Sequence, residues 1–502
     1  MGSLLIGADI GSSALKAVLV DPVAGVLAVA ERPYRMHRPH PGWAENDPAD
    51  WFDAVVAAVN ELLATAGIAA AEVAGLCVVG QRDPVVLLDE NLRVLTPAIH
   101  WTDRRDPAGT AAIFETVGRD RIIDVSGVVP TPGLVLPNLD WTRRHRPDAW
   151  RSARHAVQPK DFVLQRLTGV IATDTSSLSR SLINDWRLDD WSGQLCEAAG
   201  IPVSILPPVR FGSWEPVGTL TAEAARRLGL PTSTVVAAGG GDDQAATLGS
   251  GVLAPGELSL GTGSSLAWRA VTHEPRVDPR GRLCVARHVV PDLHIYEMVA
   301  VGSGTMLRWF REAIATVPGG EAPSYESLIA EAAVVAPGAD GLLFYPYPHG
   351  ATLPEDHPSA RGAFLGVTAH HRRGHFVRAI LEGVAYLYPP LLEILRDRGV
   401  RVERLTVIDG EARSATWNQI KADVSGRELR TTAVPEASAV GAAILAGTAA
   451  GVFASPDAGA RALVSPGPVF TPDPRATARY AGLQAGWARA AAHVFAAFEA
   501  RG

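Results

Sequence analysis

The sequence is poor in cysteine and carries no excess of positive charge. Only three cysteines occur among 502 residues, and their odd number and wide spacing exclude a disulfide framework or a paired-cysteine metal site. Lys and Arg number 46 against 53 Asp and Glu, giving a net charge of −7, which leaves no basic footprint for nucleic acid or an anionic membrane. These features favour a protein of a reducing compartment whose partners are small molecules.

Long apolar runs and the motifs of several enzyme classes are also missing. No run reaches the roughly 20 strongly apolar residues of a membrane span, and Asp9 interrupts the N-terminal apolar run before a signal-peptide core could form. We therefore expect a cytoplasmic protein. The absence of a Walker A motif, of a GxGxxG that opens a helix after a strand, of HExxH and of GxSxG disfavours P-loop, dinucleotide-binding, zinc-protease and serine-hydrolase chemistry.

The length and composition that remain are those of an ordinary globular protein. At 47% hydrophobic and 20% charged residues, 502 residues suffice for two or three domains with sizeable cores. Residues 5–18 and 257–270 resemble each other: each has an apolar run, a turn of glycine and hydroxyl residues, and a second apolar run. This pattern predicts two β-hairpins, and their offset of half the chain indicates a duplication.

The segments between the hairpins alternate between helical and strand-like patterns. Asn46 or Asp47 can cap a helix whose first turn carries Pro48, and a short β-branched strand follows at 73–79. A helix over 375–396 and a strand over 405–408 repeat this order. The alternation predicts an α/β fold with a mostly parallel or mixed sheet in each half.

Three glycine-rich turns follow strand-like runs, at 9–13, 239–243 and 261–265. Glycine lets backbone amides approach phosphate oxygens, although a turn of this kind taken alone is more often a plain connector. Two of these turns also carry aspartates. Phosphoryl transfer needs one carboxylate to hold Mg²⁺ and another to accept the proton of the attacking hydroxyl, so the aspartates favour that chemistry.

Several longer motifs resemble the FGGY carbohydrate kinases of the actin-like, ribonuclease-H-like ATPase group. The most specific is Gly362-Ala363-Phe364-Leu365-Gly366-Val367, followed after seven residues, from position 375, by HFVRAILE. Supporting segments include 159–162 (PKDF) and 436–443 (EASAVGAA), and the likeness covers almost the whole chain. The resemblance implies two actin-like domains around a central cleft, with residues 1–250 mainly binding sugar and 251–502 mainly binding ATP.

The resemblance also assigns roles to residues in the glycine-rich turns. It implies that Asp242 is the general base and that Asp9 acts on Mg²⁺ through water. The phosphate-binding residues that it implies are Gly11, Ser12, Ser13, Lys16, Gly261, Thr262 and Gly263. The alternatives are that Asp242 or Asp243 caps a helix starting near Gln244, and that Lys16 is a solvated strand residue.

The turn expected to bind the nucleotide departs from the family pattern. The family usually has three glycines before Ala-(Arg/Lys)-Ser, whereas this chain has Asp409-Gly410-Glu411 there. A carboxylate at this position could accept ribose hydroxyls, or it could repel the triphosphate. The nucleotide-binding residues that the resemblance implies are Gly410, Glu411, Ala412, Ser414 and Asn418, and ATP remains the expected nucleotide.

The substrate-binding segment departs as well, because Gln81-Arg82-Asp83 is closer to the glycerol kinases than to the Met-His-Gly of xylulose-type kinases. Arg82 and Asp83 could form a donor and acceptor pair for adjacent sugar hydroxyls, or a plain ion pair. The expected substrate-binding residues are Gln81, Arg82, Asp83, Trp101, Asp103, Asp242 and Asp243.

Residues 41–48, 101–103 and 136–139, by contrast, look more like the xylulose-type kinases. The resemblance therefore predicts an ATP- and Mg²⁺-dependent kinase acting on a terminal hydroxyl of a ketopentose, with D-xylulose the leading candidate. A glycerol or other polyol or sugar kinase is the alternative within the family. A catalytically inactive sugar-binding sensor is the alternative from another class, motivated by the altered turn at 409–411. A homodimer is one possible assembly.

Overall fold

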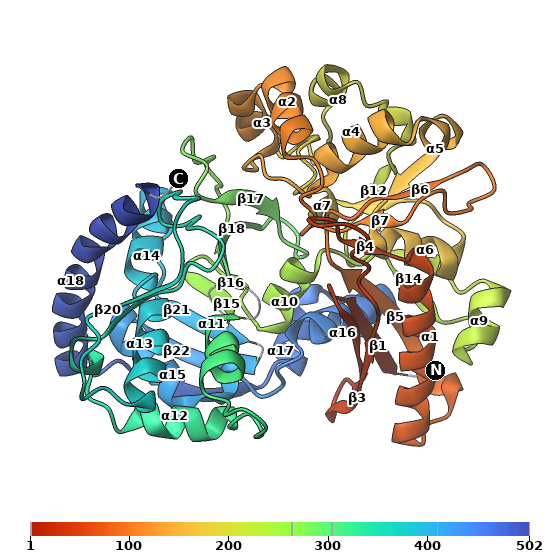
Figure 1. Cartoon of the computed structure of the whole chain (residues 1–502). Helices are drawn as coiled ribbons and strands as arrows, with labels where there is room; N and C mark the ends of the chain where they lie inside the picture. Colours follow the sequence, from red (N-terminus) through yellow and green to blue (C-terminus); the bar gives the residue numbers. More distant parts are fainter. Residues whose placement is uncertain (1–2, 263–264, 303–304, 409, 501–502) are drawn as a thin grey trace. The chain divides into compact units, whose positions relative to one another are not determined.

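The computed structural model describes residues 3–262, 265–302, 305–408 and 410–500 (Figure 1). The chain forms two compact units. The first contains Met1–Leu253, Thr272–Tyr296 and Glu436–Ser465, and the second contains Ala254–Val271, Glu297–Pro435 and Pro466–Gly502. Two segments from the C-terminal half of the chain thus fold together with its N-terminal half.

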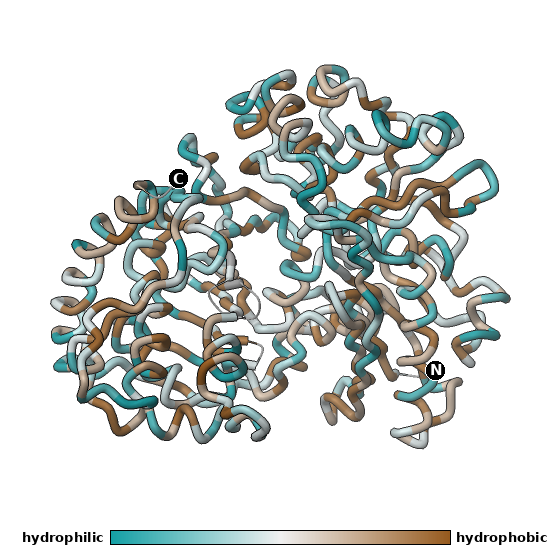
Figure 2. Tube along the Cα trace, in the orientation of Figure 1, coloured by the Kyte–Doolittle hydropathy of each residue, from teal (hydrophilic) through white to brown (hydrophobic). Residues whose placement is uncertain are grey.

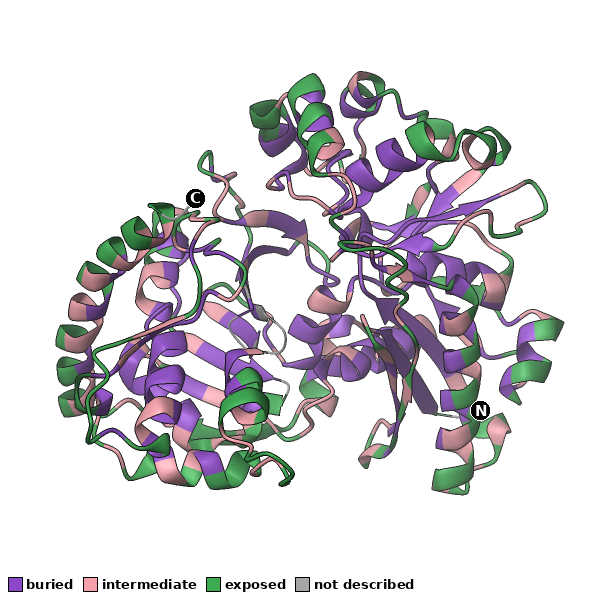
Figure 3. Cartoon of the chain, viewed as in Figure 1, coloured by how far each residue is buried: buried purple, intermediate pink, exposed green. Residues whose placement is uncertain are grey.

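The first unit is organised around a mixed sheet whose strand order is β13-β14-β5-β1-β2-β3. Adjacent pairs β1–β2 and β2–β3 are antiparallel, whereas β5 is parallel to β1 and β14 is parallel to β5. Every residue of β1 is buried, as expected of a strand covered on both faces (Figure 3). The strands are β1 (Leu4–Ile10), β2 (Ala14–Asp21), β3 (Gly25–Pro33), β5 (Val73–Gly80), β13 (Pro216–Thr219) and β14 (Val235–Ala237).

The sheet of the second unit repeats this topology in six of its seven strands, in the order β18-β16-β15-β21-β22-β23, and β17 is its seventh, outermost strand. Strand β15 is antiparallel to β16 and parallel to β21, and β22 is parallel to β21. The two predicted hairpins therefore occupy equivalent places, β1–β2 in one sheet and β15–β16 in the other. The strands are β15 (Glu257–Thr262), β16 (Ser265–Thr272), β18 (His294–Val301), β21 (Arg404–Ile408), β22 (Glu428–Thr432) and β23 (Pro466–Phe470). The architecture is the predicted α/β fold of two actin-like, ribonuclease-H-like domains.

Helix α16 (Ala437–Ala449) packs closely in the first unit against β1 and against α10 (Asp242–Gly249). A Cβ added to Gly249 would lie 1.9 Å from the Ala437 carbonyl oxygen, and one added to Gly7 would lie 2.0 Å from that of Ala439. Only glycine permits such approaches. These glycines therefore let the end of α10 pack on the start of α16, and let the start of α16 pack on β1 near Asp9.

Helix α1 (Pro48–Ala66) begins as the sequence predicts. The Asp47 side chain accepts a hydrogen bond from the Ala49 amide at 2.9 Å, and Pro48 occupies the first turn. The helix ends at Gly67, whose φ of 64° is the left-handed conformation common after helices.

The helix predicted over 375–396 is two helices, α13 (Arg373–Ala385) and α14 (Tyr388–Asp397). The prediction of one continuous helix was wrong because Pro389 and Pro390 lack amide protons. They are tolerated only in a first helical turn, which is where the structure places them.

The other helices surround these sheets. Helix α18 runs along the second unit with only Tyr480, Trp487 and Ala491 buried, and its hydropathy varies along its length (Figures 2 and 3). None of the helices among the described residues is long and apolar enough to cross a membrane. The remaining helices of the first unit are α2 (Pro107–Val117), α3 (Arg119–Ser126), α4 (Val135–His145), α5 (Pro147–Ser152), α6 (Pro159–Thr168), α7 (Thr175–Leu178), α8 (Gly193–Ala199), α9 (Ala222–Leu228) and α17 (Pro456–Leu463). Those of the second unit are α11 (Thr305–Trp309), α12 (Tyr325–Ala333), α15 (Ala415–Ser425) and α18 (Pro474–Glu499).

Short strands complete the chain. They are β4 (Glu45–Asn46), β6 (Val86–Leu88), β7 (Ala98–Ile99), β8 (His155–Val157), β9 (Thr173–Asp174), β10 (Asn184–Asp185), β11 (Asp190–Trp191), β12 (Val209–Phe211), β17 (Cys284–Arg287), β19 (Leu343–Tyr345) and β20 (Ala363–Leu365).

Candidate active site

Asp242 is the first residue of α10 and directly follows the glycine triplet Gly239–Gly241. Gly241 is the N-cap residue of α10, and no side chain caps this helix. An Asp242 carboxylate oxygen accepts a hydrogen bond from the Asp243 amide at 2.9 Å. A Cβ on Gly239 would lie 2.0 Å from the Val78 carbonyl oxygen, so glycine is required there. Close packing of the triplet on β5 thus sets the position of Asp242.

The Asp242 carboxyl group lies in an acidic, poorly solvated environment. Burial raises its pKa to about 8, the neighbouring carboxylates of Asp243 and Asp9 add to the rise, and Arg82 opposes it. A carboxyl group with a pKa near neutrality is suited to exchanging protons at physiological pH. The arrangement can therefore accept a proton from a bound hydroxyl.

Arg82 and Asp83 lie in the same buried turn but pair with different partners. Arg82 donates to Asp243 at 2.7 Å, and Arg180 lies 3.4 Å from an Asp83 carboxylate oxygen. Asp83 has a φ of 88°, and its amide donates to the Gln158 side chain at 2.8 Å. The structure thus places the two residues in separate ion pairs beside Asp242.

Gln81 precedes this turn and is 3% exposed. Its backbone amide donates to the Ile10 carbonyl at 2.8 Å, which ties it to the end of β1. Neither polar atom of its side-chain amide has a hydrogen-bond partner within the described part of the chain. Buried amides normally form such bonds, so the Gln81 side chain is well suited to bind ligand hydroxyls.

The turn between β1 and β2 contains the predicted phosphate-binding residues of this unit. The Trp101 indole nitrogen donates to the Ser12 hydroxyl at 2.9 Å, and the Tyr34 hydroxyl donates to the Gly11 carbonyl. Ser13 is exposed. Lys16 lies directly opposite Asp9 in the β1–β2 register.

Asp103 is held by contacts within the protein. One of its carboxylate oxygens accepts the Ala44 amide at 2.6 Å and a guanidinium nitrogen of Arg105 at 2.9 Å. The other accepts both the backbone amide and the Nε of Arg105. The structure therefore brings Asp242, Asp243, Gln81 and the 11–13 turn into one unit with Asp9, but engages Asp103 in a buried ion pair.

Asp9 lies at the end of β1, where the hydroxyl of Ser438 donates to its Oδ2 at 2.5 Å. No cluster of three or more metal-ligating side chains occurs among the residues that the structure describes. A single carboxylate still fits Mg²⁺, because this cation keeps several water ligands and also takes phosphate oxygens. The mutual repulsion of Asp9 and Asp242, which helps to raise the Asp242 pKa, is what a cation would relieve.

The predicted nucleotide turn lies in the second unit, where residues Gly410–Arg413 form one short helical turn. Glu411 is 6% exposed and its carboxylate contacts the Lys421 ammonium, which lies 4.2 Å from the Trp417 ring centre. The Asn418 side chain donates to the Ala412 carbonyl at 3.0 Å. Glu411 is thus buried in an ion pair with Lys421.

Three further predicted residues of the second unit lie at the end of β15 or at the start of α15. Ser414 caps α15 by accepting the Trp417 amide at 3.3 Å. Gly261 is buried near the end of β15, and Thr262 is the last residue of that strand. Gly263 and Asp409 lie outside the described residues.

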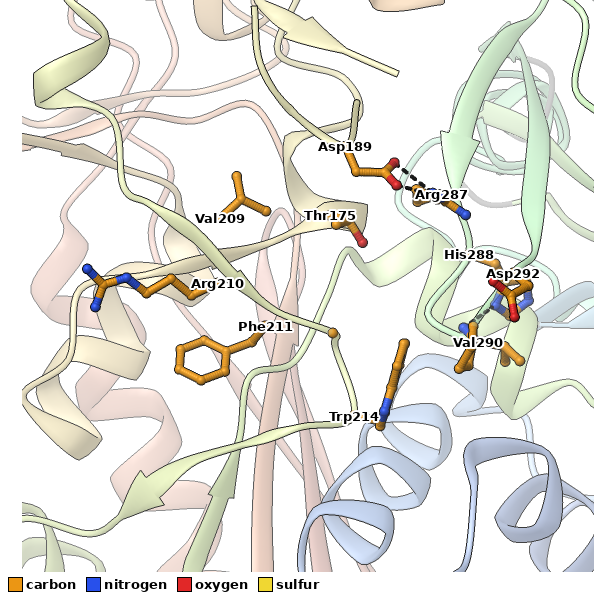
Figure 4. A pocket seen from close by; sticks show the side chains of 12 residues that line it. Thr175, Asp189, Val209, Arg210, Phe211, Trp214, Arg287, His288, Val290 and Asp292 are labelled. Carbon is orange, nitrogen blue, oxygen red and sulfur yellow. Dashed lines mark hydrogen bonds and ion pairs between the residues drawn. The ribbon is translucent and has the colours of Figure 1, made fainter. Parts of the chain in front are cut away.

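A separate cavity of about 460 Å³ lies elsewhere in the first unit (Figure 4). Its lining includes Phe211 and Trp214, with Arg287 held in an ion pair by Asp189. None of the predicted site residues lines this cavity. It is therefore distinct from the cluster around Asp242.

Two residues of the site were not among those predicted from the sequence. Ser438 belongs to the segment 436–443, which resembles the family, but that likeness did not indicate that its hydroxyl would meet Asp9. Tyr34 follows β3 and has no motif, yet burial and the charges of Asp9 and Asp242 raise its pKa. Only the fold brings these side chains to the end of β1.

The chain is similar along most of its length to proteins of known families. The models of the FGGY family of carbohydrate kinases match residues 4–249 for the N-terminal domain and 256–450 for the C-terminal domain. A xylulose kinase of Bacillus subtilis is 30% identical over 476 residues, covering 95% of this chain and 94% of that protein. A gluconokinase of Bacillus subtilis is 29% identical over 466 residues, covering 91% and 90%. The crystal structure of xylulose kinase from Rhodospirillum rubrum superposes with a TM-score of 0.90 at 34% identity, covering 99% of this chain and 100% of that one.

Proposed function

Because this chain belongs to the FGGY family of carbohydrate kinases, we propose that it transfers the γ-phosphate of ATP to a terminal hydroxyl of a ketopentose. The chain is a phosphotransferase with an alcohol group as acceptor. D-xylulose is the preferred substrate in this proposal, supported by the likeness to xylulose kinases of Bacillus subtilis and Rhodospirillum rubrum over nearly the whole chain.

The observation that carries the proposal is the environment of Asp242. This carboxyl group stands at the start of α10 beside a buried glutamine amide and a buried arginine, and its pKa is raised to about 8. A sugar hydroxyl held by the Gln81 amide would lie near a base matched to its proton. Asp242 is therefore the proposed general base, and Gln81, Arg82, Asp83 and Asp243 are the proposed binders of sugar.

Mg²⁺ and ATP are the proposed cofactors. Asp9 would hold the cation through water, with Ser438 fixing its carboxylate. The cation, when bound, would neutralise charge on the phosphate oxygens. The amides and hydroxyls of the 11–13 turn and Lys16 would bind phosphate in the first unit. Residues 1–250 would thus bind mainly sugar and residues 251–502 mainly ATP, the latter through 261–263 and the turn at 410–418.

A glycerol, polyol or other sugar substrate is the second candidate. The Gln81-Arg82-Asp83 turn favours it, since two arginines, Arg82 and Arg180, lie in partly buried ion pairs whose charges would select among polar ligands. The gluconokinase relative supports this candidate.

A coupled kinase assay across ketoses, aldoses, sugar acids and polyols tests the proposal. We expect the highest kcat/KM with D-xylulose. Asp242→Ala should lower kcat by about 10² to 10⁴-fold while calorimetry still detects sugar binding. Asp148→Ala, a change at an exposed residue of the same unit, is the control and should leave kcat unchanged. Near-normal turnover of Asp242→Ala would contradict the base assignment, and sugar binding without Mg·ATP binding would indicate a sensor.

A further inference from the structure

A cluster of buried polar residues lies behind the glycine triplet in the first unit. Lys160, Asp161 and Asp174 are each no more than 2% exposed. The Lys160 ammonium lies 2.5 Å from an Asp161 carboxylate oxygen and 3.1 Å from one of Asp174. Lys160 and Asp161 belong to the first turn of α6, and Asp174 ends β9 and caps α7.

The Asp174 carboxylate extends this cluster toward the glycine triplet. Its Oδ2 accepts hydrogen bonds from the hydroxyls of Ser176 at 2.5 Å and Ser213 at 2.6 Å. Because the Ser176 hydroxyl donates to Asp174, its oxygen is free to accept, and it accepts the Gly241 amide at 3.0 Å. The backbone of Ser213 also accepts the Gly239 amide at 3.0 Å. A chain of hydrogen bonds therefore runs from Lys160 to the residue immediately before Asp242.

The same region supports the sugar-binding turn. Gln158, which precedes α6, accepts the Asp83 amide at 2.8 Å and donates to the Ser177 carbonyl at 2.9 Å. The start of α6 and helix α7 thus contact the ends of both β5 and β14. Burying three ionised groups is unfavourable unless they are paired and hydrogen-bonded, and a hydrophobic substitute of similar volume is often as stable. Stability alone is therefore a weak reason for this cluster.

We propose that the Lys160–Asp174–Ser176 chain is a positioning device that fixes the Gly241 amide and thereby the orientation of the Asp242 carboxylate. Ser176 and Asp174 are positioning residues, since they act through the backbone and touch neither substrate nor phosphate in the proposal. Asp174 fixes the direction of the Ser176 hydroxyl, Lys160 balances the charge of Asp174, and Ser213 holds the other side of the triplet. A loose Gly241 would let the base move away from the hydroxyl, and small displacements of reacting groups are costly to catalysis. This inference depends on the proposed role of Asp242.

The test compares Ser176→Ala with a matched control, Ser126→Ala. Ser126 is also completely buried, donates to the Ile122 carbonyl and accepts the Val128 amide, but it lies in α3, away from the triplet. We expect Ser176→Ala to lower kcat about tenfold or more with the sugar KM changed less than about twofold. Ser126→Ala should lower the thermal midpoint by a similar amount, but it should leave kcat and the sugar KM near those of the unmodified protein. Unchanged kcat in Ser176→Ala, or a fall that only matches the loss of folded protein, would overturn the proposal.

A double-mutant cycle separates this inference from the proposed function. In an Asp242→Asn background, Ser176→Ala should have no further effect on the residual kcat, because its effect passes through the missing base. An equal loss in both backgrounds would overturn the positioning role. If Asp242→Asn itself stays active, the base assignment fails instead.

Should Ser176→Ala not fold, Ser213→Ala removes another donor to the same Asp174 oxygen. A folded Ser213→Ala with unchanged kcat would then count against the proposal.

Discussion

The hydroxyl of Ser438 donates a hydrogen bond to the Oδ2 of Asp9 at 2.5 Å, although the two residues are 429 positions apart. Asp9 is the last residue but one of β1, and Ser438 lies in the first turn of α16. The contact is possible because Gly7 lets α16 approach β1 closely. A segment near the C-terminus thus completes the acidic site built by the N-terminal hairpin.

Removing the Ser438 hydroxyl should weaken the binding of Mg²⁺ at Asp9. Ser438→Ala leaves the Asp9 carboxylate without one of its hydrogen bonds, and groups that orient a metal ligand typically affect affinity by about 10- to 100-fold. We expect a rise of that order in the Mg²⁺ concentration for half-maximal rate. Thr448→Val, which removes the hydroxyl that donates to Ile444 in the same helix, is the control. An unchanged Mg²⁺ requirement in Ser438→Ala would argue against the role of Asp9.

Changing Asp243 should shift the pH dependence of the rate. The Asp243 carboxylate raises the Asp242 pKa and also engages Arg82, whose charge lowers it. In Asp243→Asn the repulsion is lost and Arg82 is released, so both effects lower the Asp242 pKa. The acidic limb of kcat/KM, which we expect near pH 8 in the unmodified protein, should move to lower pH. A limb that stays in place would show that another group titrates.

Asp242 should also make stability depend on pH. Its pKa is about 8 in the folded protein against 3.8 ordinarily, so the folded state holds the proton more tightly between these values. Stability is therefore lost as pH rises from about 4 to about 8. The Asp242→Asn variant has no carboxyl group to ionise, so it does not lose this stability. Its thermal midpoint relative to the unmodified protein should therefore show no gain at pH 4 and a growing gain toward pH 8. A constant difference across this range would contradict the raised pKa.

The buried ion pair of Glu411 and Lys421 should contribute to the stability of the fold more than to nucleotide binding. Burial lowers the Lys421 pKa, and Glu411 opposes that shift. Lys421→Met leaves the Glu411 carboxylate buried without its partner, a change that typically costs about 3–5 kcal/mol. Adding Glu411→Gln should restore most of the thermal midpoint, because no buried charge then remains. Full stability of the single variant would contradict the ion pair.

Parts of the fold were predictable because local rules decide them. The two hairpins follow from apolar runs that flank glycine-rich turns, and the start of α1 follows from Asp47 and Pro48. Prolines 389 and 390 were the signal that one predicted helix would be two. The resemblance to a family indicated Asp242, since its motif is contiguous in the chain.

The α/β class, the repeated hairpins and the acidic glycine-rich turns could be predicted from local sequence, because these depend on residues close together in the chain. The pairing of Arg82 with Asp243, of Glu411 with Lys421 and of Ser438 with Asp9 depends instead on the packing of distant segments. These contacts depend on how closely helices approach strands, which glycine packing and burial set across hundreds of residues. Long-range pairing of buried charges has no local signature, because either partner alone resembles an ordinary surface residue.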